Sequence, residues 1–360
     1  MSNKRLGHRE MRPEIWGIGL VALDLIIASE RSEPSVAAGG TCGNVLSILS
    51  RLGWHATPIA RLGKDAASKK VESDLCEWGV DIRFLHLRPT AKTPVIVERI
   101  RTDSSGLPFH TFSFSCPACG QRLPSFQPVT VRSVSSIATG LADVDVLFVD
   151  RASASSIKLA EEASNLGVIV FFEPSAHSSR AHFSALIELA HIIKYSHDRV
   201  DSIGHDNWGS RTLLEIQTLG RGGLRFRTKL ASNMTWRNLA AQPVARLRDA
   251  AGSGDWLSSA LIYSICRGGV KRFRSRSLAE VVRGLNFGQA LAAWNCEFSG
   301  ARGGMYNLSP SQFWSLVKRA KTGQAPQLSN DAPMGPEVLT VSREICQMCD
   351  RTPLLIRSHA

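Results

Sequence analysis

The chain has 360 residues, of which 43% are hydrophobic and 21% charged, and it carries a formal net charge of +12. This balance excludes intrinsic disorder and collagen-like repetition, and the length suffices for one large or two medium domains with a sizeable core. The apolar runs are far shorter than the roughly 18 residues that cross a membrane, and the polar, basic start lacks the apolar core of a signal peptide. We therefore expect no membrane partner and a cytoplasmic location.

The positive charge favours anionic ligands. We interpret the densest basic run, residues 267–276, as a solvated loop and expect no nucleic-acid partner.

The first third of the chain alternates apolar runs with segments of helical spacing. The predicted elements are, in order, a strand at 15–23, a helix at 42–52, a strand at 57–60, a helix ending near residue 79, and two strands at 94–101 and 109–114 that form a hairpin. A strand, a loop and a helix thus open the chain.

From residue 144 onwards, strand and helix patterns alternate regularly. The predicted elements are strands at 144–150, 168–174 and 191–196 with helices between them, two strands around a glycine turn within 213–227, and helices at 255–266 and 278–298. This alternation predicts a parallel sheet covered by helices on both faces. The stretch from about residue 322 is rich in glycine, proline, serine and asparagine and indicates a linker before the C-terminal tail.

Four of the eight cysteines form two Cys-x-x-Cys pairs, Cys116 with Cys119 and Cys346 with Cys349. In a cytosolic chain such pairs indicate metal or redox chemistry more than disulfides. We predict that the four thiolates hold one structural zinc ion, because the Cys-Pro-Ala-Cys-Gly run has the form of a zinc knuckle. The alternative is two unrelated thiol pairs, one of them redox-active.

The most informative segment is the loop Asp249-Ala-Ala-Gly-Ser-Gly-Asp255, which leads directly into an apolar helix. Small residues here let successive backbone N–H groups converge on an anion at the positive end of the helix dipole. A carboxylate in the first turn suits a base that takes a proton from a substrate hydroxyl. The alternative is a glycine-rich turn in which Asp255 only caps the helix.

The DAAGSGD run resembles the signature of the ribokinase-like carbohydrate kinases, the PfkB family. The segment Gly39-Gly-Thr-Cys-Gly-Asn44 and the later Arg61-Leu-Gly-Lys-Asp65 resemble the same family, and the resemblance covers roughly residues 14–310. It implies a ribokinase-like three-layer α/β fold with a central, mostly parallel sheet, helices on both faces and a small β lid. The implied domain spans 1–321, with lid strands at about 15–30 and 93–115, and residues 322–360 form a linker and a tail that folds back.

Several site residues are implied by position in the family's motifs. Asp255 would be the catalytic base, and Ala251, Gly252, Ser253 and Gly254 would form the anion hole. Asp24, Gly40, Asn44 and Asp65 would contact sugar hydroxyls or shape their pocket, although Asn44 and Asp65 are equally interpreted as helix caps. Thr218, Gly220 and Gly223 would line the ATP cleft, and their alternative is an ordinary hairpin turn.

One motif departs from the family pattern. Where the family has an Asn-x-x-Glu motif that organises the water shell of Mg²⁺, this chain has Ser196-His-Asp-Arg199. Asp198 or Glu173 could replace the acidic residue, or an arginine could offset phosphate charge directly. The segment between 196 and 213 is also shorter than the helical crossover expected there.

Two functions follow from these residues. The first is an ATP- and Mg²⁺-dependent kinase that phosphorylates a hydroxymethyl group of a sugar, sugar derivative or nucleoside, with a possible homodimer through the lid. The second is a catalytically weakened, kinase-fold binding or regulatory protein with a zinc site and a basic surface. The intact Asp255 and glycine loop favour the first.

Overall fold

Two β-sheets organise the chain in the computed structural model, which describes residues 12–28, 34–174, 179–200, 208–322 and 337–338. The larger sheet has nine strands in the order β13-β12-β11-β10-β9-β8-β1-β4-β5. Its strands are β1 (Glu14–Ile18), β4 (His55–Gly63), β5 (Leu85–Arg88), β8 (Val146–Val149), β9 (Ile169–Phe172), β10 (Ile192–Ser196), β11 (Leu214–Thr218), β12 (Leu224–Thr228) and β13 (Arg237–Leu239). All neighbours pair in parallel except β11 with β12 and β12 with β13.

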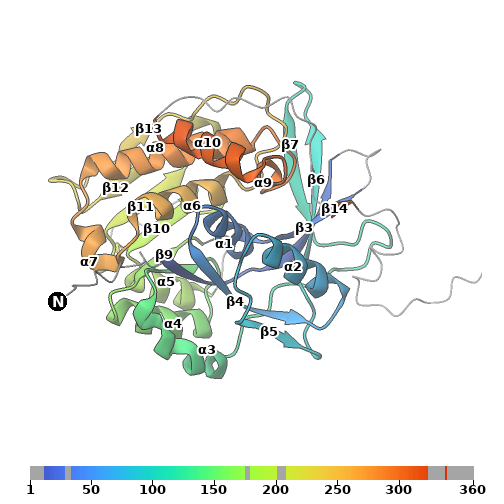
Figure 1. Cartoon of the computed structure of the whole chain (residues 1–360), viewed down its shortest axis with the longest axis horizontal. Coiled ribbons are helices and arrows are strands. Elements are labelled where there is room, and N and C mark those ends of the chain that lie inside the picture. The colour runs from blue at the N-terminus through green and yellow to red at the C-terminus, as the bar shows by residue number, and fades with distance from the viewer. Residues whose placement is uncertain (1–11, 29–33, 175–178, 201–207, 323–336, 339–360) are drawn as a thin grey trace, which may run out of the picture.

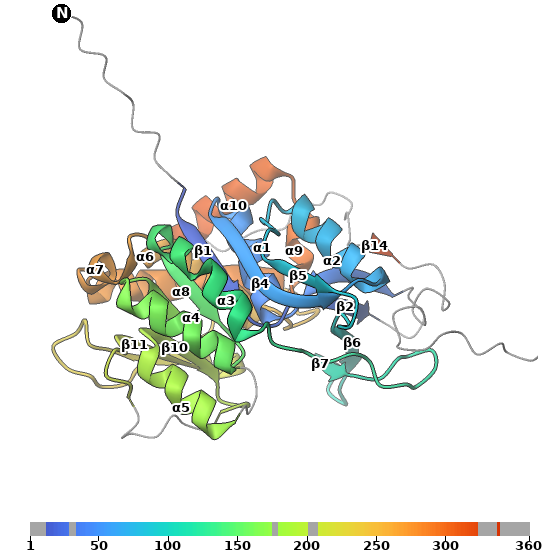
Figure 2. The ribbon, with the colours of Figure 1, turned by 90° about the horizontal axis from the view of Figure 1, so that it is seen from below.

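The helices lie on both faces of this sheet, as Figures 1 and 2 show. They are α1 (Thr41–Arg51), α2 (Ala66–Glu77), α3 (Val131–Ile137), α4 (Ala154–Asn165), α5 (Arg180–Leu189), α6 (Ser253–Ile265), α7 (Gly269–Arg274), α8 (Leu278–Asn295), α9 (Gly303–Tyr306) and α10 (Pro310–Lys321), with short 3₁₀ turns at Ala138–Asp143 and Gly220–Gly222. In the part of the chain that the structure describes, no helix is both long and apolar enough to cross a bilayer.

The central strands are buried on both faces, which is why they read as continuous apolar runs. Along β8, Val146 and Phe148 belong to the core shared with α1, α6 and α8, whereas Leu147 and Val149 belong to the core under α3, α4 and α5. Serine N-caps that form capping boxes begin α4, α8 and α10, at Ser153, Ser277 and Ser309. The predicted three-layer α/β architecture is confirmed.

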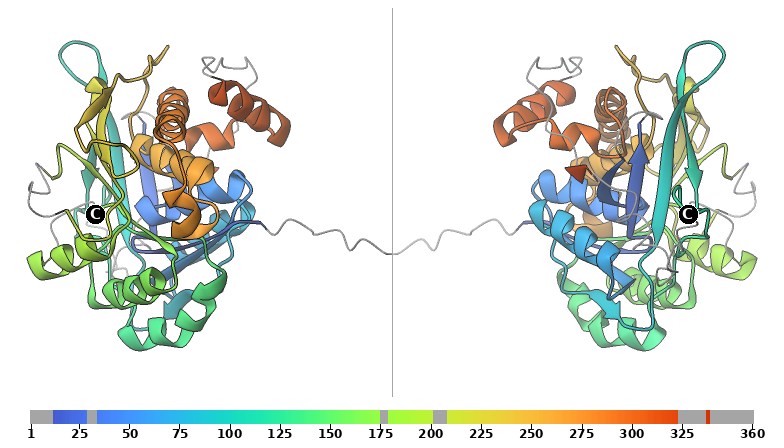
Figure 3. Two further views of the ribbon diagram at one scale, coloured as in Figure 1. Left: turned by 90° about the vertical axis from the view of Figure 1, so that its left-hand side faces the viewer. Right: turned by 90° about the vertical axis from the view of Figure 1, so that its right-hand side faces the viewer.

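The smaller sheet has five strands in the order β14-β3-β2-β6-β7. They are β2 (Ala22–Ile27), β3 (Ser35–Gly39), β6 (Val95–Thr102), β7 (Pro108–Ser113) and β14 (Glu337–Val338). The hairpin of β6 and β7 runs as a long narrow blade along one side of the molecule, in teal in Figure 3. The expected lid segment 15–30 differs from this arrangement: β1 lies in the large sheet, and the small sheet takes β2 and also β3.

The large sheet brings two predicted residues, Glu173 and Thr218, to one edge. Glu173 directly follows β9, and Thr218 is the last residue of β11. The carboxyl ends of parallel strands meet at the same edge of a sheet. Between β10 and β11, the described residues contain no helix, which agrees with the shortened crossover expected from the sequence.

Candidate active site

The loop before α6 is shaped by two glycines. Gly252 has φ +72°, and a Cβ there would lie 2.2 Å from the carbonyl oxygen of Ala301. A Cβ at Gly254 would lie 3.3 Å from Nζ of Lys194. Only glycine therefore combines the left-handed backbone at 252 with close packing against the loop of Ala301. The result is a tight turn whose chain enters α6 at Ser253.

Not all amides of this loop are free to bind an anion. The N–H of Ala251 donates to Oδ1 of Asp249 at 2.9 Å, and the N–H of Ser253 donates to the carbonyl of Ala250 at 3.2 Å. Gly252 is the N-cap of α6 and Gly254 lies in its first turn, so their N–H groups lie at the positive end of this helix. The loop can therefore offer an anion fewer donors than the four consecutive positions predicted.

Asp255 lies in the first turn of α6 and does not cap it, because the N-cap is Gly252. Its Oδ2 accepts a hydrogen bond from Nδ2 of Asn44 at 2.8 Å, and Oδ1 of Asn44 in turn accepts from Nε of Arg302 at 3.1 Å. Asn44 is inside α1, whose N-cap is Gly40, so the capping interpretation of Asn44 is wrong. The structure thus joins α1, α6 and the segment before α9 through one chain of side-chain contacts.

The pKa of Asp255 is raised to about 7. Burial is the largest cause, and the negative charge of Glu173 adds to it, while the hydrogen bond from Asn44 and the charges of Lys194 and Arg199 act in the opposite direction. A carboxyl group with a pKa near neutrality can accept a proton and release it again at cellular pH. This is the property that a general base needs.

Asp24, at the middle of β2, lines a small pocket together with Asn44, Arg302, Tyr306 and the loop 299–301. Burial raises the pKa of Asp24 to about 7, against the lowering effect of the Arg302 charge. Within the described residues, Oδ1 of Asp24 and Nη1 of Arg302 are buried without a hydrogen-bond partner. Buried polar atoms are normally satisfied, so these two suit a ligand that brings its own hydroxyl groups.

Arg302 was not predicted from the sequence. Its guanidinium contacts Oδ2 of Asp74 at 2.7 Å and the carbonyl of Ala38, and the Tyr306 hydroxyl donates to the same Asp74 carboxylate. The pair of Arg302 and Asp74 therefore ties α2 to the loop beside the pocket. A lone arginine after a helix carries no sequence signal for this role.

A second unpredicted group lies under the anion loop. Lys194, 2% exposed in β10, forms an ion pair with Oε1 of Glu173, and Oε2 of Glu173 accepts from the hydroxyl of Ser258 on α6. A buried lysine within the apolar run of 191–196 was a usable signal, because lysine is seldom fully buried without a partner. Arg199, which the sequence predicts to stand in the place of the family's acidic residue, is exposed and near enough for its charge to lower the pKa of Asp255.

Asp65 has the structural role that the sequence left open. It is the N-cap of α2, with Oδ1 accepting from the N–H of Ser68 at 2.8 Å, and its Oδ2 accepts from the N–H of Thr93 at 2.9 Å. Both oxygens are thus engaged by backbone near the base of the lid hairpin. A contact between Asp65 and substrate stays a prediction.

The predicted nucleotide residues lie at the end of β11. Thr218 ends this strand, and Gly220 and Gly223 form the 3₁₀ turn into β12, with φ values of 56° and 87°. The predicted hairpin is confirmed. Its role in an ATP cleft stays a prediction.

The two cysteine pairs are only partly visible. Cys116 is buried and Cys119 is exposed, and the N–H of Gly120 donates to the carbonyl of Cys116 in a tight turn. Cys346 and Cys349 lie outside the described residues. The shared zinc site is therefore still a prediction.

Comparison with known proteins agrees with this geometry. The model of the pfkB family carbohydrate kinases matches residues 13–307, and the chain belongs to this family. A probable fructokinase of Arabidopsis thaliana is 22% identical over 247 residues, which are 64% of this chain and 73% of the plant protein. The chain is thus a phosphotransferase of the carbohydrate-kinase type by family.

Solved structures show the same fold. The ATP-bound fructokinase of Xylella fastidiosa superposes with a TM-score of 0.65 at 18% identity, covering 81% of this chain and 94% of that one. The aminoimidazole riboside kinase of Salmonella enterica, solved with its riboside and an ATP analogue, gives 0.62 at 18% identity, covering 84% and 99%. Ribokinase from Giardia lamblia gives 0.61 at 14% identity, covering 81% and 95%.

Proposed function

We propose that this protein is an ATP-dependent kinase that phosphorylates a hydroxymethyl group of a sugar, sugar derivative or nucleoside. The observation that supports this most is the buried Asp255, with a pKa of about 7, in contact with Asn44 at the start of α6. Asn44 also lines the small pocket around Asp24. A base and a hydroxyl-binding pocket therefore share one residue.

In the proposed reaction, Asp255 takes the proton of the acceptor hydroxyl as its oxygen attacks the terminal phosphorus of ATP and the bond to ADP breaks. Within the predicted anion hole of residues 251–254, the N–H groups of Gly252 and Gly254 are the main donors, since those of Ala251 and Ser253 already donate within the loop. Asp24 and Asn44 hold substrate hydroxyls, while Gly40 and Asp65 shape the surrounding backbone.

On the nucleotide side, Thr218, Gly220 and Gly223 line the ATP cleft in this proposal. Mg²⁺ bound with ATP would offset the charge of the phosphates. The family's acidic position does not fit this role here, because Arg199 occupies it and both oxygens of Glu173 are engaged by Lys194 and Ser258. No step of the proposal therefore depends on a magnesium ion held by the protein, and Arg199 supplies fixed positive charge.

The presence of Arg199 at the position where the family has an acidic residue also supports a second candidate function. This is a kinase-fold binding or regulatory protein with weakened turnover. The two functions are separated by measuring ADP release with a panel of sugars and nucleosides, with mass spectrometry of the product. A kinase yields ADP and a phosphorylated acceptor for at least one compound. Saturable binding of ATP and of a sugar without any turnover would instead support the binding protein, and a salt-dependent DNA-binding assay run alongside would test for a polyanionic partner.

Two further features belong to the proposal. The short strand β14 pairs with β3, which supports a tail that returns to the lid sheet. On the lid, Phe112 and Phe114 are exposed by 45% and 54%, and this apolar surface supports a homodimer through the lid. A cytoplasmic location is part of the same proposal.

A further inference from the structure

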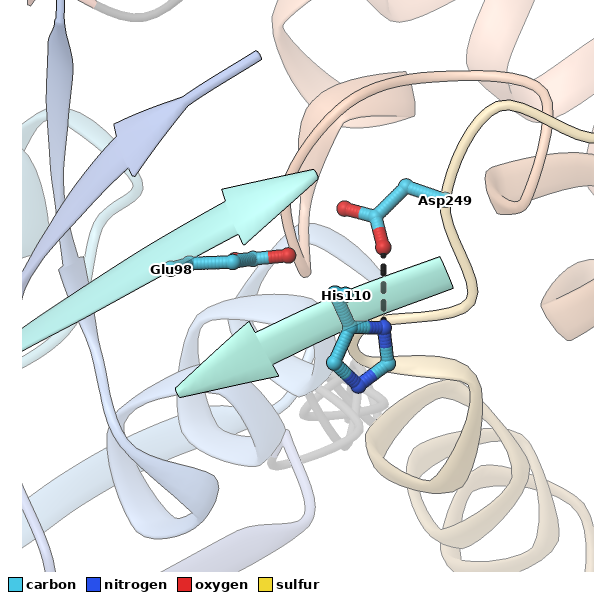
Figure 4. A group of neighbouring side chains, drawn as sticks. All are labelled: Glu98, His110 and Asp249. Atoms are coloured by element: carbon cyan, nitrogen blue, oxygen red, sulfur yellow. Dashed lines mark hydrogen bonds and ion pairs between the residues drawn. The ribbon is translucent and has the colours of Figure 1, made fainter. Parts of the chain in front are cut away.

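Three potential metal ligands from distant segments meet between the lid and the phosphate loop. Glu98 comes from β6, His110 from β7, and Asp249 from the loop that leads into α6 (Figure 4). Their ligand atoms all lie within 4.8 Å of one another. No other cluster of this kind is found among the residues that the structure describes.

Glu98 is the member that points to a missing partner. It is 1% exposed, and no described residue gives its Oε1 a hydrogen bond. Burial raises the pKa of Glu98 well above its usual range, and the nearby Asp249 carboxylate raises it further. Two buried carboxylates side by side need either a shared proton or a cation.

Asp249 is held as metal ligands usually are. Oδ1 accepts from the N–H of Ala251 at 2.9 Å, and Oδ2 accepts from the N–H of Gly300 at 2.8 Å. Burial alone would raise the pKa of this carboxyl, but the hydrogen bonds from His110, Glu98 and these two amides outweigh burial and lower it. Such outer contacts fix the orientation of a ligating carboxylate.

The spacing of the donors also suits an ion. Nδ1 of His110 lies 3.1 Å from Oδ1 of Asp249, and two ligands bound at about 2.1 Å and at right angles lie about 3 Å apart. One imidazole and two carboxylates suit a divalent transition metal such as Mn²⁺, Fe²⁺ or Zn²⁺, and two carboxylates neutralise its charge. The His110 side chain is 24% exposed, which gives the ion a path from solvent.

We propose that Glu98, His110 and Asp249 bind one divalent transition-metal ion that fastens the β6–β7 hairpin to the loop preceding the anion hole. Two ligands lie on the lid and the third lies two residues before Ala251. Binding of the ion would therefore restrain the lid and the phosphate loop together. This site uses different residues from the predicted cysteine zinc site.

The test is a titration of the full-length protein with Mn²⁺, without nucleotide, followed by electron paramagnetic resonance and calorimetry. Mn²⁺ is the probe because it prefers oxygen and nitrogen donors to thiolates, so the cysteine pairs do not interfere. We expect one saturable site, and Glu98→Gln and His110→Ala should each weaken it by about 10-fold to 100-fold or more. Hydrogen exchange in the hairpin at 95–113 should slow when Mn²⁺ is added to the wild-type protein only.

Matched controls make the result specific. Thr111→Ala changes the next residue of β7, whose side chain lies on the opposite face of the strand, and should leave Mn²⁺ affinity unchanged. Asp255→Asn should also bind Mn²⁺ normally. The proposal is overturned if the wild-type protein has no saturable site, if Glu98→Gln and His110→Ala bind as tightly as wild type, or if Asp255→Asn is the variant that loses the ion.

Discussion

Nδ2 of Asn44 donates to Oδ2 of Asp255 across 2.8 Å, although the two residues are 211 positions apart in the chain. The contact joins α1 to α6, the helix that carries the proposed base. It also connects that base, through Oδ1 of Asn44, to the buried guanidinium of Arg302. The proposed proton acceptor and the proposed hydroxyl pocket are therefore one polar network.

The pH dependence of kcat/KM should report the ionisation of Asp255. The base acts only when ionised, and since its pKa is raised to about 7, kcat/KM should rise with pH and level off above about pH 8. Asn44→Ala removes a hydrogen bond that lowers this pKa, so its rising limb should move to higher pH. Ser47→Ala, which removes a hydrogen bond to Gly43 on the same helix, is the control and should keep the wild-type limb. If the rising limb of kcat/KM lies at the same pH in Asn44→Ala as in the wild type, the pH dependence does not report the ionisation of Asp255.

Arg199→Ala should change the dependence of turnover on ATP and on magnesium, because we predict that the residue stands at the family's acidic position. Loss of its positive charge should also raise the pKa of Asp255. Initial rates measured across ATP and magnesium concentrations test this, with His197→Ala as an exposed neighbouring control. Titrations identical to wild type would remove Arg199 from the nucleotide site.

Lys194→Met should destabilise the fold, since it leaves Glu173 buried without its cation. Breaking a buried ion pair from one side typically costs about 3 to 5 kcal/mol. The double variant Lys194→Met with Glu173→Gln should recover much of that loss, as measured by urea unfolding. If Lys194→Met alone is as stable as wild type, the ion pair does not support the loop.

Protein purified without chelator should contain close to one zinc ion per chain if the two Cys-x-x-Cys pairs share a site. Cys346→Ser should lose the zinc and loosen the C-terminal tail, as limited proteolysis would show. Cys76→Ser, which changes an exposed thiol on α2, is the control. Wild-type protein free of zinc would refute the shared site.

The sequence predicted the fold well because its signals are local. Capped helices, apolar strands such as 146–149 and the glycine loop before Asp255 each act within a few residues. The contacts that complete the site are long-range: Arg302 reaches Asn44 across 258 positions, and His110 reaches Asp249 across 139. Neither hydrophobic periodicity nor a short sequence motif predicts contacts between residues so far apart in the chain. Lys194 is the exception, because a lysine inside a buried strand requires a buried partner.

The most direct test of the proposed function is the rate of phosphoryl transfer by Asp255→Asn with the best acceptor from the substrate panel. Asparagine is close in size to aspartate but cannot take the hydroxyl proton, so the rate should fall by about 100-fold to 10,000-fold. ATP binding and the circular dichroism spectrum should remain near wild type. Turnover at the wild-type rate by Asp255→Asn would contradict the assignment of Asp255 as the base.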